Sequence, residues 1–93
     1  PKTVILGANY PDPFNAETGI EYALPQDARV RLEIFDILGQ RVRTLADEVQ
    51  SAGFKKITWN STNDAGEEVA SGVYFIQLTV GEQRLVGKMT LQK

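Results

Sequence analysis

Residues 30–39 carry the clearest strand pattern in the chain and read Val30-Arg31-Leu32-Glu33-Ile34-Phe35-Asp36-Ile37-Leu38-Gly39. Their first five positions alternate apolar and charged side chains, which is the period of a half-buried β-strand. Asp36 then suits the first position of a turn, and Gly39 suits a position that needs a positive φ. The stretch predicts a strand that ends in a short hairpin loop, and hence an antiparallel sheet.

Similar short apolar runs recur along the chain, separated by Gly, Pro, Asn and Asp at spacings of about 8–12 residues. We count about seven runs, which is the pattern of an all-β antiparallel sandwich or barrel. Residues 73–80 are apolar on both faces near their start and predict a central strand. Gly81-Glu82 predicts a two-residue type II′ turn into a final strand that runs to Lys93. The residues of that strand expected to face inward are Leu85, Gly87, Met89 and Leu91.

Two segments are less regular. Residues 9–15 contain two prolines, which forbid a helix and a central ladder strand, so we expect an ordered loop or a sheet edge. The apolar residues between 42 and 49 are spaced as on one face of a helix, at i, i+3, i+4 and i+7. We favour the alternative, a strand followed by a loop, because the surrounding sequence is strand-like and Gly53 follows soon after.

Length and composition limit what this fold can do. At 93 residues the chain is predicted to be one domain, residues 1–93, because a core of this size cannot be divided into two self-supporting halves. It contains no Cys and no His, which removes disulfides, thiolate and imidazole metal sites and the usual hydrolase machinery. We therefore expect a non-catalytic domain with no cofactor and no bound metal. A formal net charge of -2 also argues against nucleic acid as the partner.

Several motifs follow one another in a characteristic order. They are Asn9-Tyr10-Pro11-Asp12-Pro13-Phe14-Asn15, the stretch 30–39, Trp59 before a polar loop that ends at Gly66, Val69-Ala70-Ser71-Gly72-Val73-Tyr74-Phe75, and Lys88-Met89-Thr90-Leu91-Gln92-Lys93. Over nearly the whole chain, this order resembles the C-terminal sorting domains of type IX secretion substrates. The immunoglobulin-like domain of the flagellar hook-capping protein shares the Asp-x-x-Gly hairpin, the Trp and the Ser-Gly-Val-Tyr segment. The Tyr-Pro-x-Pro-Phe-Asn loop and the Lys-x-x-Leu-x-Lys terminus favour the sorting domain.

The resemblance implies both a fold and a function. It implies an immunoglobulin-like sandwich that sits last in a large secreted enzyme or adhesin of a Gram-negative bacterium. Domains of that family are recognised by the outer-membrane translocon, and a sortase-like protease typically removes them before the cargo is joined to surface lipopolysaccharide. The chain is then expected to be a secretion and sorting signal that travels through the periplasm to the cell surface or the medium, with cargo domains on its N-terminal side.

Eight residues are candidates for recognition by that machinery. They are Lys88, Met89, Leu91 and Lys93 in the terminal strand, Gly72 and Tyr74 at the start of the preceding strand, and Arg29 and Arg31 in the hairpin. Lys88 and Lys93 flank an edge-like strand that a receptor can read by strand addition. The arginines, with Arg41 and Arg43, either form a basic patch for an anionic translocon surface or lipopolysaccharide, or pair with Glu33 and its neighbours across the strands.

Other conspicuous residues have a structural explanation. Gly72 permits a sharp turn into its strand, and Tyr74 is expected to bury its ring while its hydroxyl caps a nearby backbone group. Trp59 is expected to be a core anchor rather than a platform on which a sugar stacks. The oxygen-bearing side chains between 60 and 68 fit a solvated turn better than a calcium site, because Ala65 stands where an EF-hand needs Gly.

Two other classes of function stay open. An accessory carbohydrate-binding or spacer module of a glycoside hydrolase would need an exposed row of aromatic rings. The aromatic residues that we expect to face mostly inward are Tyr22, Phe35, Phe54, Trp59, Tyr74 and Phe75. A structural subunit like the flagellar hook cap would need self-assembly or a filament partner.

Overall fold

A computed structural model describes residues 1–93 and consists of strands and loops. The strands are β1 (Ile5–Leu6), β2 (Thr18–Leu24), β3 (Ala28–Asp36), β4 (Arg41–Gln50), β5 (Gly53–Trp59), β6 (Gly72–Val80) and β7 (Gln83–Leu91). None of the chain forms a helix of the length and apolar character needed to cross a bilayer.

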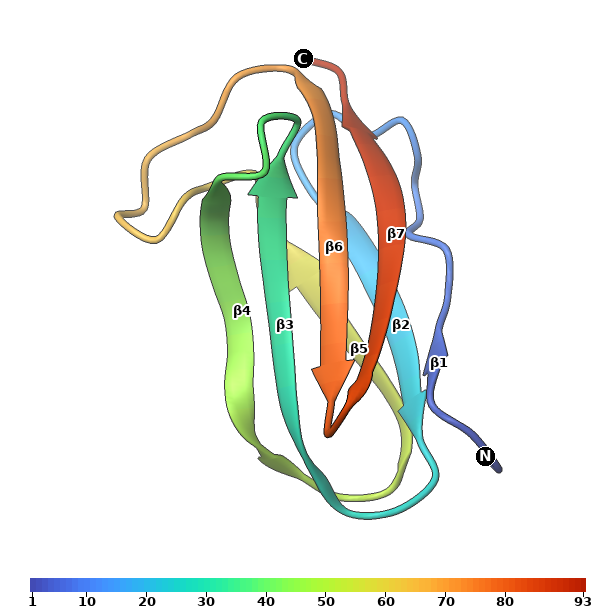
Figure 1. Cartoon of the computed structure of the whole chain (residues 1–93). Coiled ribbons are helices and arrows are strands. Elements are labelled where there is room, and N and C mark those ends of the chain that lie inside the picture. The colour runs from blue at the N-terminus through green and yellow to red at the C-terminus, as the bar shows by residue number, and fades with distance from the viewer.

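The seven strands form two sheets that pack face to face (Figure 1). One sheet has three strands in the order β1-β2-β5, and the other has four in the order β4-β3-β6-β7. Every pairing between neighbouring strands is antiparallel. This confirms the predicted all-β antiparallel sandwich, and it places β6 inside its sheet, as its apolar sequence indicated.

The β3 to β4 hairpin has the predicted turn. One carboxylate oxygen of Asp36 accepts hydrogen bonds from the backbone N–H of Leu38 and of Gln40, each at 2.9 Å. Gly39 has a φ of 81°, a conformation that L side chains rarely adopt. The next hairpin, between β6 and β7, turns at Gly81, whose φ of 59° is the positive value that a type II′ turn requires.

β4 is a continuous strand from Arg41 to Gln50, so the helical alternative is wrong, and so is the loop expected in its second half. Its pairing with β3 contains two register shifts, and Val42 and Leu45 are the two extra residues that these shifts leave unpaired. Each bulge moves the following side chains to the other face. The apolar positions of a strand with two bulges therefore lose the period of two and imitate the spacing of a helix.

The core fills the space between the sheets and is centred on Trp59, whose side chain is fully buried. Its indole ring packs edge to face against Phe14, at 5.9 Å between ring centroids, and against Tyr74, at 5.2 Å. The indole N–H donates a hydrogen bond to the carbonyl oxygen of Thr62, at 2.9 Å. Trp59 is therefore a core anchor, as predicted, and its one polar atom is satisfied.

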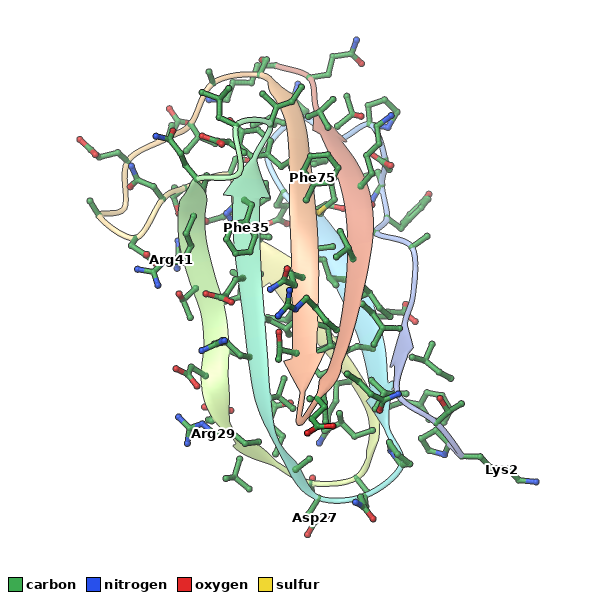
Figure 2. The ribbon with its side chains drawn as sticks, viewed as in Figure 1. Lys2, Asp27, Arg29, Phe35, Arg41 and Phe75 are labelled. Carbon is green, nitrogen blue, oxygen red and sulfur yellow. The ribbon has the colours of Figure 1, made fainter.

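Three aromatic residues do not face inward as expected. Phe54 is 80% exposed, and Phe35 and Phe75 are half-buried cross-strand neighbours on the outer face of the four-stranded sheet (Figure 2). Successive residues of a strand point to opposite faces, so Phe35 must point outward once Ile34 points inward. Because Phe54 lies on the other sheet, these rings do not form a single exposed row.

Candidate functional site

The loop 9–15 and the end of β7 form one structural unit, which we call the terminal junction and define as residues 12–14 and 90–92. The backbone N–H of Phe14 donates to the carbonyl of Thr90 at 3.0 Å, and the N–H of Gln92 donates to the carbonyl of Phe14 at 2.8 Å. The N–H of Thr90 donates to a carboxylate oxygen of Asp12 at 2.9 Å. The loop therefore acts as a short strand at the edge of the four-stranded sheet, parallel to β7 at this point.

The loop itself is held by a small polar network. The side-chain amide of buried Asn9 donates to the hydroxyl oxygen of Thr18 at 3.1 Å, and that hydroxyl donates to the carbonyl of Pro11 at 2.8 Å. Both peptide bonds that precede the prolines, at Pro11 and Pro13, are cis. The residues 9–15 thus form the ordered edge that the two prolines predicted.

Of the candidate recognition residues, Leu91 lies in the terminal junction, and Gly72, Tyr74 and Met89 lie next to it. Gly72 pairs with Leu91, and Tyr74 pairs with Met89, in the ladder between β6 and β7. The Tyr74 hydroxyl donates to the carbonyl of Ala70 at 2.6 Å, so this side chain buries its ring and caps the backbone, as predicted. Burial, with a smaller contribution from the negative charge of Asp36, raises the pKa of Tyr74 above its ordinary value.

The side chains of β7 divide into those that build the core and those that can be contacted. Met89 and Leu91 are completely or almost completely buried, so their side chains are not available to a receptor. Lys88 is exposed on the outer face, beside its cross-strand partner Phe75. The strand ends at Leu91 rather than at Lys93, whose backbone N–H donates to the hydroxyl of Ser71 at 3.1 Å.

Arg29 and Arg31 do not form a free basic patch. The Arg29 guanidinium lies 2.9 Å from a carboxylate oxygen of Asp47, and that of Arg31 lies 3.2 Å from Glu33. Arg41 is also close to Glu33, at 3.9 Å. Pairing across the strands, the second of the two alternatives, describes Arg29 and Arg41, whereas Arg31 pairs with Glu33 of its own strand. Figure 2 places Arg29 toward the end of the sandwich opposite the C-terminus, so the structure separates it from the terminal junction.

The polar loop between β5 and β6 uses its oxygens on its own backbone. One side-chain oxygen of Asn63 accepts from the N–H of Ala65 at 3.0 Å and from the N–H of Glu67 at 2.9 Å. A carboxylate oxygen of Asp64 accepts from the N–H of Thr44 at 2.9 Å. The loop is therefore a turn held by its own hydrogen bonds and bound to β4 through Asp64. The chain contains no group of three or more Asp and Glu residues placed to hold a metal ion.

Both halves of the terminal junction carry a recognisable motif in the sequence, but the sequence does not show that the two halves meet. Asp12 and Thr90 are 78 positions apart, and nothing in either motif states which strand the loop will meet. A polar side chain between two prolines was the one available signal, because such a side chain is well placed to accept a backbone hydrogen bond.

A protein-family model matches most of the chain. The model of the FlgD Ig-like domain matches residues 12–84. The chain belongs to the FlgD Ig-like domain family. The match leaves out residues 1–11 and most of β7, so it contains only part of the Tyr-Pro-x-Pro-Phe-Asn loop and none of the Lys-x-x-Leu-x-Lys segment. No curated protein matches the chain.

Solved structures support the same immunoglobulin-like fold. Dimeric latent PorU from Porphyromonas gingivalis matches with a TM-score of 0.72 and 22% identity, over 95% of this chain and 9% of PorU. PorZ, an essential bacterial surface component of the type IX secretion system of P. gingivalis, matches with 0.60 and 21%, over 97% of this chain and 11% of PorZ. FlgD from Xanthomonas campestris matches with 0.65 and 22%, over 95% of this chain and 64% of FlgD. The chain spans less than two thirds of each of these proteins.

Proposed function

We propose that this FlgD Ig-like domain is a non-catalytic secretion and sorting signal of a larger exported protein, recognised by the type IX translocon. On this proposal the cargo precedes the domain, a sortase-like protease separates the two, and the cargo reaches the cell surface or the medium through the periplasm.

The terminal junction is the observation that carries the proposal. The Tyr-Pro-x-Pro-Phe-Asn loop and the Lys-x-x-Leu-x-Lys segment are the features that resemble sorting domains rather than the hook cap. In the fold these two segments are joined by three hydrogen bonds, although Asp12 and Thr90 are 78 positions apart. A receptor that meets this end of the molecule therefore meets both motifs as one surface.

The comparisons and the composition support this proposal from different directions. PorZ is a component of the type IX secretion system, and its matching part has the fold of this chain. The absence of Cys and His removes the side chains on which most hydrolytic and metal-dependent catalysis depends. We leave lipopolysaccharide contact through Arg29 and Arg31 out of the proposal, because both guanidinium groups are already in ion pairs.

The test is an export assay with a fluorescent cargo in a type IX-competent host. Four fusions are compared: the intact domain, the domain with Asp12→Ala, the domain with Asp12→Asn, and the cargo alone with its export signal. We expect the intact and Asp12→Asn fusions at the surface or in the medium, the cargo alone in the periplasm, and less export of the Asp12→Ala fusion. Equal distribution of the intact fusion and the cargo alone would overturn the proposal.

A second candidate function is a structural role like that of the hook cap. It is favoured by the family match and by FlgD of X. campestris, described as a hook-capping protein essential for flagellar assembly. It predicts assembly onto a filament or self-association rather than export of a fused cargo. Restoration of flagellar assembly by this domain, when it replaces the corresponding domain of FlgD in a strain that lacks FlgD, would favour it over the sorting function.

A further inference from the structure

β7 is the outermost strand of the four-stranded sheet, so one side of its backbone has no partner strand. Thr90 points both its N–H and its C=O away from β6, toward the loop of the terminal junction. In an antiparallel strand the backbone groups of alternate residues point the same way, and the register between β6 and β7 contains no shift. The backbone N–H and C=O of Arg84, Val86 and Lys88 therefore also point away from β6.

This row of backbone groups is not hydrogen-bonded to any loop, although β1 lies near β7, whereas other parts of the sheet edges are covered. The terminal junction covers β7 from Thr90 onward. At the opposite edge, Asp64 covers part of β4: its backbone N–H donates to the carbonyl of Val42, and its carboxylate accepts from the N–H of Thr44. Two bulges also interrupt β4. No such loop contact reaches the outward-facing backbone of β7 between residues 84 and 88. Natural sheets usually cover or shorten edges of this kind.

The side chains around the open row define what fits it. Val86 is 59% exposed, and Arg84 and Lys88 lie two residues on either side of it on the same face. Beside the row runs a groove of about 240 Å³ between β7 and the segment that follows β1. Among the residues that line it are Leu6, Gly7, Ala8, Val86, Gly87 and Lys88. An incoming strand would therefore place an apolar side chain against Val86, acidic side chains beside Arg84 and Lys88, and small side chains over the groove.

We infer that the open edge of β7 at Arg84, Val86 and Lys88 binds an extended, acidic segment of another protein by strand addition. A second copy of the domain is a poor occupant for this edge through its own β7, because antiparallel pairing would bring the basic side chains of the two strands together. The inference extends the proposed function and rests on it in one respect: the acidic segment would belong to a protein of the export machinery. The binding itself is tested without that machinery.

The probe is a synthetic seven-residue peptide, blocked at both ends, with the sequence Ala-Glu-Ala-Val-Ala-Glu-Ala. It is titrated into the isotope-labelled 93-residue chain, and the amide resonances are followed by NMR. We expect saturable shifts that are largest at the amides of Arg84, Val86 and Lys88. The same peptide with N-methyl groups on its pairing amides is expected not to bind, because strand addition requires those hydrogen bonds.

Two substitutions separate strand addition from simple charge attraction. Val86→Pro removes an edge-facing N–H that the ladder to β6 does not use, and it is expected to abolish binding, whereas Val86→Thr retains it. The double variant Arg84→Glu, Lys88→Glu is expected to weaken binding of the glutamate peptide roughly tenfold and to favour a lysine version, which shows that the variant is folded.

Three results would overturn the inference. They are an absence of shifts at the β7 edge, equal binding of the N-methylated peptide, and edge-paired oligomers of the free domain in sedimentation experiments. Failure of export with intact peptide binding would instead count against the proposed function and leave the binding edge in place.

Discussion

Asp12→Ala tests the terminal junction by removing one hydrogen bond. The carboxylate of Asp12 accepts the backbone N–H of Thr90 at 2.9 Å, and the side chain is exposed, so the substitution opens no cavity in the core. The net contribution of such a bond is about 1 kcal/mol. For a domain of this size, a loss of about 1 kcal/mol lowers the midpoint of thermal unfolding by roughly 4–8 °C. Asp12→Asn keeps an oxygen acceptor and is expected to unfold close to the parent temperature.

The assay that isolates this bond is amide hydrogen exchange measured by NMR. A global loss of about 1 kcal/mol accelerates exchange through complete unfolding by roughly fivefold at every such amide. The Thr90 amide loses its own acceptor and is expected to accelerate by more than that factor in Asp12→Ala, but not in Asp12→Asn. The reasoning would be refuted if the Thr90 amide exchanged at the same rate in Asp12→Ala as in the parent chain, or at the same rate in the two variants. Either result would show that the Asp12–Thr90 hydrogen bond does not hold the loop against β7.

Three further predictions concern the core and its titrating groups. Tyr74→Phe removes the 2.6 Å hydrogen bond to Ala70 and is expected to lower the free energy of unfolding by about 1 kcal/mol in urea denaturation. Burial raises the pKa of both Tyr22 and Tyr74 above 10.0, so stability is expected to be constant just below pH 10 and to fall above it, less steeply in Tyr74→Phe. Trp59→Phe leaves a carbonyl without its 2.9 Å donor and a void in the core, and it is expected to cost about 2–4 kcal/mol in the same urea assay.

Each of these expectations can fail in a recognisable way. A Tyr74→Phe variant as stable as the parent would show that water replaces the lost bond. A stability profile that does not change between pH 9 and pH 11 would show that neither tyrosine keeps its proton more tightly in the folded state. A Trp59→Phe variant of parental stability would show that the aromatic cluster repacks.

The alternation of side chains within each strand could be predicted from the sequence alone. Val30, Leu32 and Ile34 are fully buried, as their spacing required, because a strand turns successive side chains to opposite faces. The β3 to β4 hairpin was predictable for the same local reason, since Asp36 and Gly39 satisfy the turn without help from distant residues.

Features that depend on pairing partners could not be predicted in this way. The bulges that hold Val42 and Leu45 exist only because β4 pairs with β3, and they hid the strand period in the sequence. The outward positions of Phe35 and Phe75 follow from the register of their strands, although their apolar character alone suggested burial. The hydrophobicity of a side chain indicates that burial is favourable, but the register of its strand determines which face of the sheet it points to.

The candidate site shows the same division. The sequence by itself determined an all-β chain with no Cys and no His, its turns, and the two motifs that resemble a sorting domain. Only the tertiary structure joined Asp12 to Thr90, placed Arg29 in an ion pair with Asp47, and left the edge of β7 open at Val86. Local patterns are set by the stereochemistry of neighbouring residues, but contacts across 78 positions are set by the packing of two sheets around one core.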